Sequence, residues 1–179
     1  MKGKNVILGV TGSIAAYKAA DIASALVQKG INVTVIMTAS ATKFITPFTL
    51  QTLTRNRVLC DQFDIDSVID PSHISLTDKN DLVLIAPATA NFIGKVANGI
   101  ADDALTSLML AVKCPVLVAP AMNDRMYQNK AVQENMKKLK QFGYKFIDPE
   151  KGYLACGSYG DGRLANLGRI ISAVQRELK

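Results

Sequence analysis

Short hydrophobic runs, each followed by a helical pattern, constrain the fold of this chain more than any other feature. Four such runs lie at residues 6–10, 32–37, 81–86 and 115–119. They are rich in Val, Ile, Leu and Ala, which is typical of strands buried on both faces of a parallel sheet. Residues 14–29 repeat hydrophobic side chains at helical spacing, and Gly30 stands where a helix would end. This strand–helix–strand unit has the length of a right-handed βαβ crossover.

The same alternation continues to the end of the chain. Further helices are expected at residues 41–45, 47–54, 90–98, 103–112, 130–142 and 167–178, and a last strand at 145–147. The sequence therefore predicts an α/β fold: a doubly wound parallel sheet, Rossmann-like or flavodoxin-like, with helices on both faces. Because no linker or repeat interrupts the pattern, we expect residues 1–179 to form a single domain.

Composition excludes several classes of function. The net charge is +6, and the basic residues form no stripe with interleaved aromatic residues, so we expect no nucleic-acid partner. A mildly basic chain suits anionic ligands such as phosphates. Three cysteines without CxxC spacing predict neither a disulfide framework nor a zinc site, and they favour a reducing cytoplasm. We expect no signal peptide and no membrane span.

The first strand runs into a loop suited to a phosphate group. Gly12 lets the backbone approach an anion, and the following helix would present free N–H groups. Ser13 adds a hydroxyl, which could instead simply cap the helix. After the second strand, residues 38–42 carry three hydroxyl side chains and no acid. Dinucleotide sites usually have an acid here for the ribose, so the pattern favours a mononucleotide such as FMN.

Two later strand ends also carry small or polar residues. Residues 86–92 follow the third strand and offer backbone against which a flat ring could lie. Asn123 follows the fourth strand and is open to two interpretations, a helix N-cap or a ligand contact. Asp102 and Asp103 have the position of caps for the next helix, with catalysis as the alternative.

Two side chains are candidate reagents. His73 is the sole histidine, and its ordinary pKa of ~6.5 would suit proton transfer, with a structural role as the alternative. Cys156 lies in a Gly-rich stretch at residues 152–163, which predicts a mobile loop that exposes the thiol. Cys60 and Cys114 flank expected strands, where packing explains them.

These motifs resemble those of the homo-oligomeric flavin-containing cysteine decarboxylases. The segments that carry the resemblance are 12–18 (GSIAAYK), 87–91 (PATAN), 99–103 (GIADD), 120–126 (PAMNDRM) and 155–157 (ACG). The Pro-x-Met-Asn-x-x-Met element and Ala-Cys-Gly are the most specific parts, and they are most similar to the branch that acts on phosphopantothenoylcysteine. The family usually has Trp where this chain has Tyr127, an exchange that we expect to be tolerated.

The resemblance implies a role for each motif. FMN would be held by residues that follow the first three strands, namely Gly12, Ser13, Ile14, Thr38, Ser40, Phe44, Thr89, Ala90 and Asn91. The substrate would contact Met122, Asn123 and Arg125, and Asn123 would bind its carboxylate. His73 would lie beside the reacting cysteine moiety, and Cys156, on a lid, would donate a proton. The candidates for the residue that binds the substrate phosphate are Arg125, Lys95 and Arg163.

The implied reaction converts 4′-phospho-N-pantothenoylcysteine to 4′-phosphopantetheine in coenzyme A biosynthesis. Oxidation of the thiol to a thioaldehyde, with hydride passing to FMN, would create an electron sink β to the carboxylate; reduction would follow loss of carbon dioxide. Relatives that act on the C-terminal cysteine of peptides resemble this chain at the Asn motif but lack the lid cysteine and stop at the enethiol. Cys156 therefore favours the saturated product.

Three alternatives stand beside this interpretation. A peptidyl-cysteine decarboxylase is disfavoured by Cys156, and a flavin prenyltransferase resembles the chain less at the Asn and Cys motifs. A regulatory flavoprotein would bind its partners through an acidic tail, which this sequence lacks. The family assembles as trimers or dodecamers, which implies a homotrimer or dodecamer here. The chain stops at Lys179 after an expected helix, so we expect a free-standing decarboxylase, although a fragment of a fusion with a synthetase would have the same sequence.

Overall fold

The centre of the molecule is a parallel sheet. The computed structural model describes residues 2–61 and 79–179, and in them six strands pair in the order β3-β2-β1-β4-β5-β6. The strands are β1 (Asn5–Val10), β2 (Asn32–Met37), β3 (Val58–Leu59), β4 (Leu82–Ala88), β5 (Val116–Pro120) and β6 (Lys145–Phe146). All five pairings are parallel, and chain order reverses between β1 and β4. The predicted doubly wound α/β fold is confirmed.

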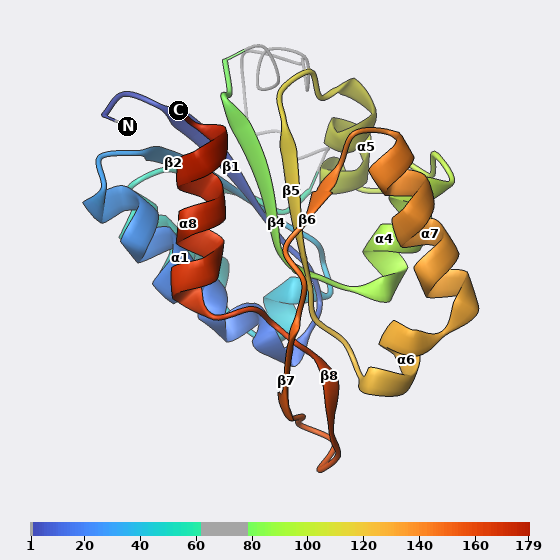
Figure 1. Cartoon of the computed structure of the whole chain (residues 1–179). Helices are drawn as coiled ribbons and strands as arrows, with labels where there is room; N and C mark the ends of the chain where they lie inside the picture. The colour runs from blue at the N-terminus through green and yellow to red at the C-terminus, as the bar shows by residue number, and fades with distance from the viewer. Residues whose placement is uncertain (1, 62–78) are drawn as a thin grey trace.

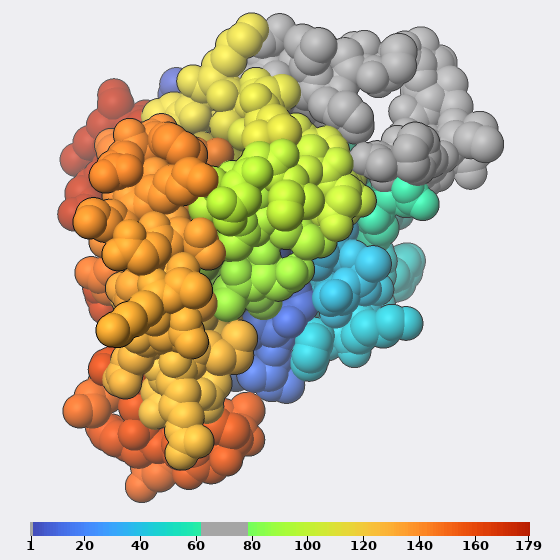
Figure 2. All heavy atoms as spheres, turned by 90° about the vertical axis from the view of Figure 1, so that its right-hand side faces the viewer, coloured from blue at the N-terminus to red at the C-terminus, as the bar shows by residue number. Residues whose placement is uncertain are grey.

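Helices cover both faces of this sheet (Figure 1). One face carries α1 (Ala19–Gln28), α2 (Pro47–Thr54) and α8 (Leu167–Glu177), and the other carries α4 (Ala90–Ala97), α5 (Ala104–Ala111) and α7 (Lys130–Gln141). Helices α4 and α7 lie side by side on the second of these faces, as Figures 1 and 2 show. Successive side chains of a strand point to opposite faces, so Leu8 packs in one hydrophobic cluster and Ile7 in the other. Each of these two side chains is fully buried.

Several short elements differ from the sequence prediction. The helix expected at 14–29 is a 3-10 segment, η1 (Ile14–Lys18), continued by α1, and a second 3-10 segment, η2 (Ala41–Lys43), precedes α2. Strand β3 and helix α6 (Asp124–Gln128) were not predicted, because elements of two to five residues are too short to establish a hydrophobic period.

The Gly-rich stretch at 152–163 differs in part from the predicted loop: its two ends are strands, whereas residues 154–158 form a turn that exposes Cys156, as expected. It belongs to an antiparallel hairpin of β7 (Glu150–Tyr153) and β8 (Tyr159–Arg163), which projects beyond the parallel sheet (Figure 1). Gly152 and Gly160 are paired across this hairpin. These glycines therefore lie in strands, where a missing side chain permits the close approach of neighbouring groups.

In the two described ranges, no helix combines the length and the apolar character that crossing a bilayer requires.

Candidate functional site

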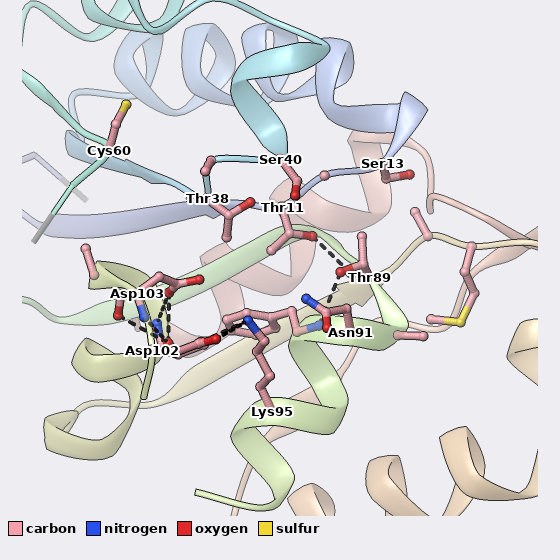
Figure 3. Close-up of a pocket in the computed structure, with 18 of the residues that line it drawn as sticks. Thr11, Ser13, Thr38, Ser40, Cys60, Thr89, Asn91, Lys95, Asp102 and Asp103 are labelled. Carbon is pink, nitrogen blue, oxygen red and sulfur yellow. Dashed lines mark hydrogen bonds and ion pairs between the residues drawn. The ribbon is translucent and has the colours of Figure 1, made fainter. Parts of the chain in front are cut away.

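A cavity of about 690 Å³ lies beyond the carboxyl ends of β1, β2 and β4 (Figure 3). The order of strands reverses between β1 and β4, and doubly wound sheets bind ligands at such a crossing. Most of the residues predicted for FMN line this cavity: Gly12, Ser13, Thr38, Ser40, Thr89, Ala90 and Asn91. Two do not, since Ile14 lines a neighbouring cavity and Phe44 is an exposed side chain at the end of η2.

Gly12 allows the loops after β1 and β2 to meet at the edge of this cavity. A Cβ atom on Gly12 would lie 2.3 Å from Cβ of Ser40, which is closer than real atoms approach. Thr11 joins the same loop to the end of β4: its hydroxyl donates to the Pro87 carbonyl at 2.7 Å and accepts from the Thr89 N–H at 3.0 Å. The three strand ends are thus held together without any long side chain, which leaves space for a ligand.

Two helical segments begin at this cavity, and each is capped by a hydroxyl. Ser13 accepts a hydrogen bond from the Ala15 N–H at 3.3 Å, so the capping interpretation of Ser13 is confirmed. Thr89 accepts from the Phe92 N–H at 3.3 Å at the start of α4. Helix N-termini carry partial positive charge and free N–H groups, so this end of the cavity suits an anion such as a phosphate.

The opposite part of the cavity wall carries acidic groups with defined partners. Asp103 is the N-cap of α5 and forms a capping box with Thr106, which confirms its predicted role. Asp102 does not cap the helix; it forms an ion pair with Lys95 at 2.7 Å, seen as dashed lines in Figure 3. The hydrogen bond from Lys95 lowers the pKa of Asp102 below its ordinary value.

A second cavity, of about 340 Å³, adjoins the first, with Ser13, Ala121 and Met122 in the walls of both. Asn123 and Cys156 also line it. The Asn123 side chain fulfils the capping interpretation, because its Oδ1 accepts from the Arg125 N–H at 2.9 Å at the start of α6. Its Nδ2 takes no part in the cap and donates to Sγ of Cys156 at 3.1 Å.

The thiol of Cys156 is exposed and surrounded by hydrogen-bonding groups. Its Sγ lies 3.1 Å from Oγ of Ser158, whose hydroxyl also reaches Oδ1 of Asp124 at 3.4 Å. The side chain and backbone N–H of Ser158, followed by the amide of Asn123, lower the pKa of this thiol. Burial has the opposite effect on Cys114, where it raises the pKa of the thiol. Cys156 therefore loses its proton more readily than an ordinary cysteine.

Two glycines of β8 hold the hairpin against the segment that carries Asn123. A Cβ atom on Gly162 would lie 2.2 Å from the Met122 carbonyl oxygen, and the Met122 N–H donates to the Gly162 carbonyl at 3.0 Å. At Gly160, a Cβ atom would lie 2.7 Å from Cβ of Asp124. Side chains at these positions would push the hairpin, and with it Cys156, away from Asn123.

The remaining predicted residues are not brought into this arrangement. His73 lies outside the described residues. Arg125 is exposed on α6 and lines neither cavity. Sequence reasoning missed the contacts of Ser158 and Asp124, although each lies within two residues of a predicted site residue. It also missed Lys18, which lines the second cavity and is the last residue of the 12–18 motif.

Known proteins resemble the chain over almost its whole length. The model of the Flavoprotein family matches residues 1–179. The chain is 50% identical to the coenzyme A biosynthesis bifunctional protein CoaBC of Bacillus subtilis, over 98% of this chain and 43% of that protein. It is 45% identical to a probable phosphopantothenoylcysteine decarboxylase of Streptococcus mutans, over 98% of this chain and 99% of that protein. It thus spans less than half the length of the bifunctional relative.

Solved structures of related proteins also resemble the chain. A PPC decarboxylase mutant, in complex with pantothenoylaminoethenethiol, is 31% identical with a TM-score of 0.87, over 98% of both chains. The FMN binding protein AtHal3 is 31% identical with a TM-score of 0.83, over 98% of this chain and 96% of that chain. The resemblance inferred from the motifs is confirmed, and the chain belongs to the Flavoprotein family.

Proposed function

We propose that this chain binds FMN and decarboxylates 4′-phospho-N-pantothenoylcysteine to 4′-phosphopantetheine, a step of coenzyme A biosynthesis. The observation that carries the proposal is the thiol of Cys156, held 3.1 Å from the amide of Asn123 in the wall of a cavity that adjoins the predicted FMN cavity. Relatives that share 50% and 45% of its residues are named for coenzyme A biosynthesis and for this decarboxylase, which supports the assignment.

The first cavity has the size and the donors that FMN requires. Its volume of about 690 Å³ is in the range of cofactor sites, and hydroxyls and helix N-termini gather at one end for a phosphate. The loop after β2 contributes Thr38 and Ser40 and has no acid that would hold the ribose of a dinucleotide. Bound FMN would supply reversible acceptance of a hydride from the substrate.

Asn123 would bind the substrate carboxylate. Its Oδ1 is engaged as the cap of α6, so the orientation of the amide is defined and Nδ2 points toward the second cavity. A neutral donor holds a carboxylate in place and does not stabilise it as strongly as a cation would, so the carboxylate can still leave as carbon dioxide.

Cys156 would protonate the carbon that loses the carboxylate. The proton leaves Sγ, and the thiolate that forms is stabilised by hydrogen bonds from Ser158 and Asn123. Solvent then restores the thiol, because the side chain is exposed.

Two measurements on the purified protein test the function. Oxidised FMN absorbs visible light, so we expect a yellow protein, or a colourless one that becomes yellow when FMN is added. Incubation with phosphopantothenoylcysteine should release carbon dioxide and form 4′-phosphopantetheine, identified by mass spectrometry. A yellow protein without decarboxylase activity would favour a regulatory flavoprotein, and activity on peptides that end in cysteine would favour the peptidyl-cysteine decarboxylases. Carbon dioxide release by a protein that cannot bind FMN would refute the proposal.

We also propose that the chain assembles as a homotrimer or dodecamer and acts in the cytoplasm. Its family resemblance supports the assembly, and exposed hydrophobic side chains such as Leu110 on α5 offer a contact surface. Light scattering coupled to size-exclusion chromatography would distinguish a trimer, a dodecamer and a monomer by mass.

A further inference from the structure

The second cavity carries two cationic side chains, and none of the described residues in its wall is acidic. Lys18, the last residue of η1, and Arg163, the last residue of β8, both line it. Neither forms an ion pair with another residue in the described ranges. The side chain of Arg163 lies across Gly152, where a Cβ atom would be 3.3 Å from its Cδ and Nη1. Two cations without a protein counter-ion favour an anionic ligand in this cavity.

We propose that Lys18 and Arg163 bind the phosphate group of the substrate, while Asn123 and Cys156 engage its cysteine end in the same cavity. The inference rests on the proposed function and extends it, because it assigns the part of the enzyme that recognises the phosphate. The substrate bears its phosphate at the end opposite the cysteine, so both ends would lie in one cavity of about 340 Å³, with the reagents and the cations in its wall.

The first cavity is a poor place for this phosphate. Asp61, Asp102 and Asp103 line it, and its cation Lys95 is bound by Asp102 with distances of 2.7 and 2.9 Å. A second phosphate there would meet negative charge. Arg125 lines neither cavity. Of the candidates drawn from the sequence, Arg163 alone shares a cavity with Cys156.

Lys18 should contribute more to phosphate binding than Arg163, because water screens its charge less: Lys18 is half-buried, whereas Arg163 is exposed. It also borders a smaller hollow that contains Asp21, but no ion pair joins these residues, so the ammonium is available to a ligand. Arg163 lies on the hairpin that carries Cys156, and its contact with the phosphate would help to hold the hairpin over the substrate.

The test compares the substrate with and without its phosphate, 4′-phospho-N-pantothenoylcysteine and N-pantothenoylcysteine, in the flavin-loaded protein. Lys18→Ala should lower kcat/KM for the phosphorylated substrate by roughly 10- to 100-fold, mainly through KM, because a charge-assisted hydrogen bond is lost. Arg163→Ala should lower it by about 3- to 10-fold, because water screens the exposed guanidinium. Neither variant should change kcat/KM for the unphosphorylated substrate.

Matched variants separate charge from folding. Lys18→Arg should keep the preference for the phosphorylated substrate, and Lys151→Ala, on the same hairpin but outside both cavities, should behave as the wild type. The assignment is wrong if Lys18→Ala affects both substrates equally, or if Arg125→Ala, rather than Lys18→Ala, removes the preference. A wild-type protein that decarboxylates neither substrate would overturn the proposed function itself, and the phosphate subsite with it.

Discussion

Cys156 owes its acidity to neighbours that belong to its own turn and to a distant loop. The hydroxyl of Ser158 is the largest contributor to the lowered pKa, and Asn123 reaches the thiol across 33 residues of sequence. Because its pKa is lowered, the Cys156 thiol is converted to the thiolate at a lower pH than the thiol of an ordinary cysteine. The same interactions that make the thiol a better acid stabilise the thiolate that it leaves behind.

Ser158→Ala should raise the pKa of Cys156 toward its ordinary value. The rate of alkylation by iodoacetamide follows the thiolate, so its midpoint should move to higher pH in the variant. Mass spectrometry of the peptide that contains Cys156 gives this rate separately from those of the other cysteines. Cys114, whose pKa is raised by burial, serves as the internal control and should react equally in both proteins. An unchanged midpoint for Cys156 would show that Ser158 does not tune the thiol.

Cys156→Ser should uncouple decarboxylation from the final protonation. A serine hydroxyl is a far weaker acid than a thiol, so carbon dioxide should still be released while the unsaturated, oxidised product accumulates. Formation of 4′-phosphopantetheine should fall by about 100-fold or more. Mass spectrometry of the products distinguishes the two compounds by the mass of two hydrogens. Normal production of 4′-phosphopantetheine would remove Cys156 from its assigned role.

At the scale of elements, the position of the β7–β8 hairpin depends on Gly162. This residue has φ +129° and leaves no space for a Cβ atom beside the Met122 carbonyl, whereas Gly157, with φ +85°, has open space around it. Gly157→Ala should therefore cost about 1 kcal/mol, from the backbone alone. Gly162→Ala should cost about 2 kcal/mol or more and should also raise the pKa of Cys156, because the hairpin moves away from Asn123.

Urea unfolding and alkylation of Cys156 measure these two effects separately. Equal stability and equal thiol reactivity in the two glycine variants would show that the close approach of Gly162 to Met122 does not fix the position of the hairpin.

The start of α5 offers a second test at this scale. The Asp103 carboxylate accepts from the Thr106 N–H at 2.7 Å, so Asp103→Ala should lower the free energy of unfolding by about 1 kcal/mol. Asp103→Asn keeps an acceptor oxygen and should retain most of this stability. Equal losses in the two variants, measured by urea unfolding, would mean that the charge and not the cap is important.

For the molecule as a whole, binding of FMN should stabilise the fold, because FMN in the first cavity would contact loops that follow three different strands. A ligand at 100 times its Kd adds about 2.7 kcal/mol to the free energy of unfolding, so FMN should raise Tm measurably. Gly12→Ala should abolish this increase, since its Cβ atom would lie 2.3 Å from Cβ of Ser40 and would separate the loops. Gly94→Ala, in α4 and outside the cavity, should keep it. Equal increases in the two variants would place FMN elsewhere.

The layout of the whole molecule could be predicted because its strands are buried on both faces. Such strands must be continuously hydrophobic, and this requirement is visible in runs such as Leu82–Ala88. The hairpin could not be predicted in the same way. Its burial alternates over a few residues, and Gly160 and Gly162 are explained by a backbone that arrives from another part of the chain. A glycine that permits close packing and a glycine in a loop have the same appearance in sequence.

The sequence by itself determined the alternation of strands and helices, and with it the edge of the sheet at which the loops gather. Local periodicity is sufficient for this, because each element buries its own hydrophobic face. Tertiary structure alone decided that Cys156 meets Asn123 and that Lys18 shares a cavity with Arg163. Such contacts depend on the path of the chain between elements and on how closely two backbones approach. Neither quantity is recorded in the spacing of neighbouring residues.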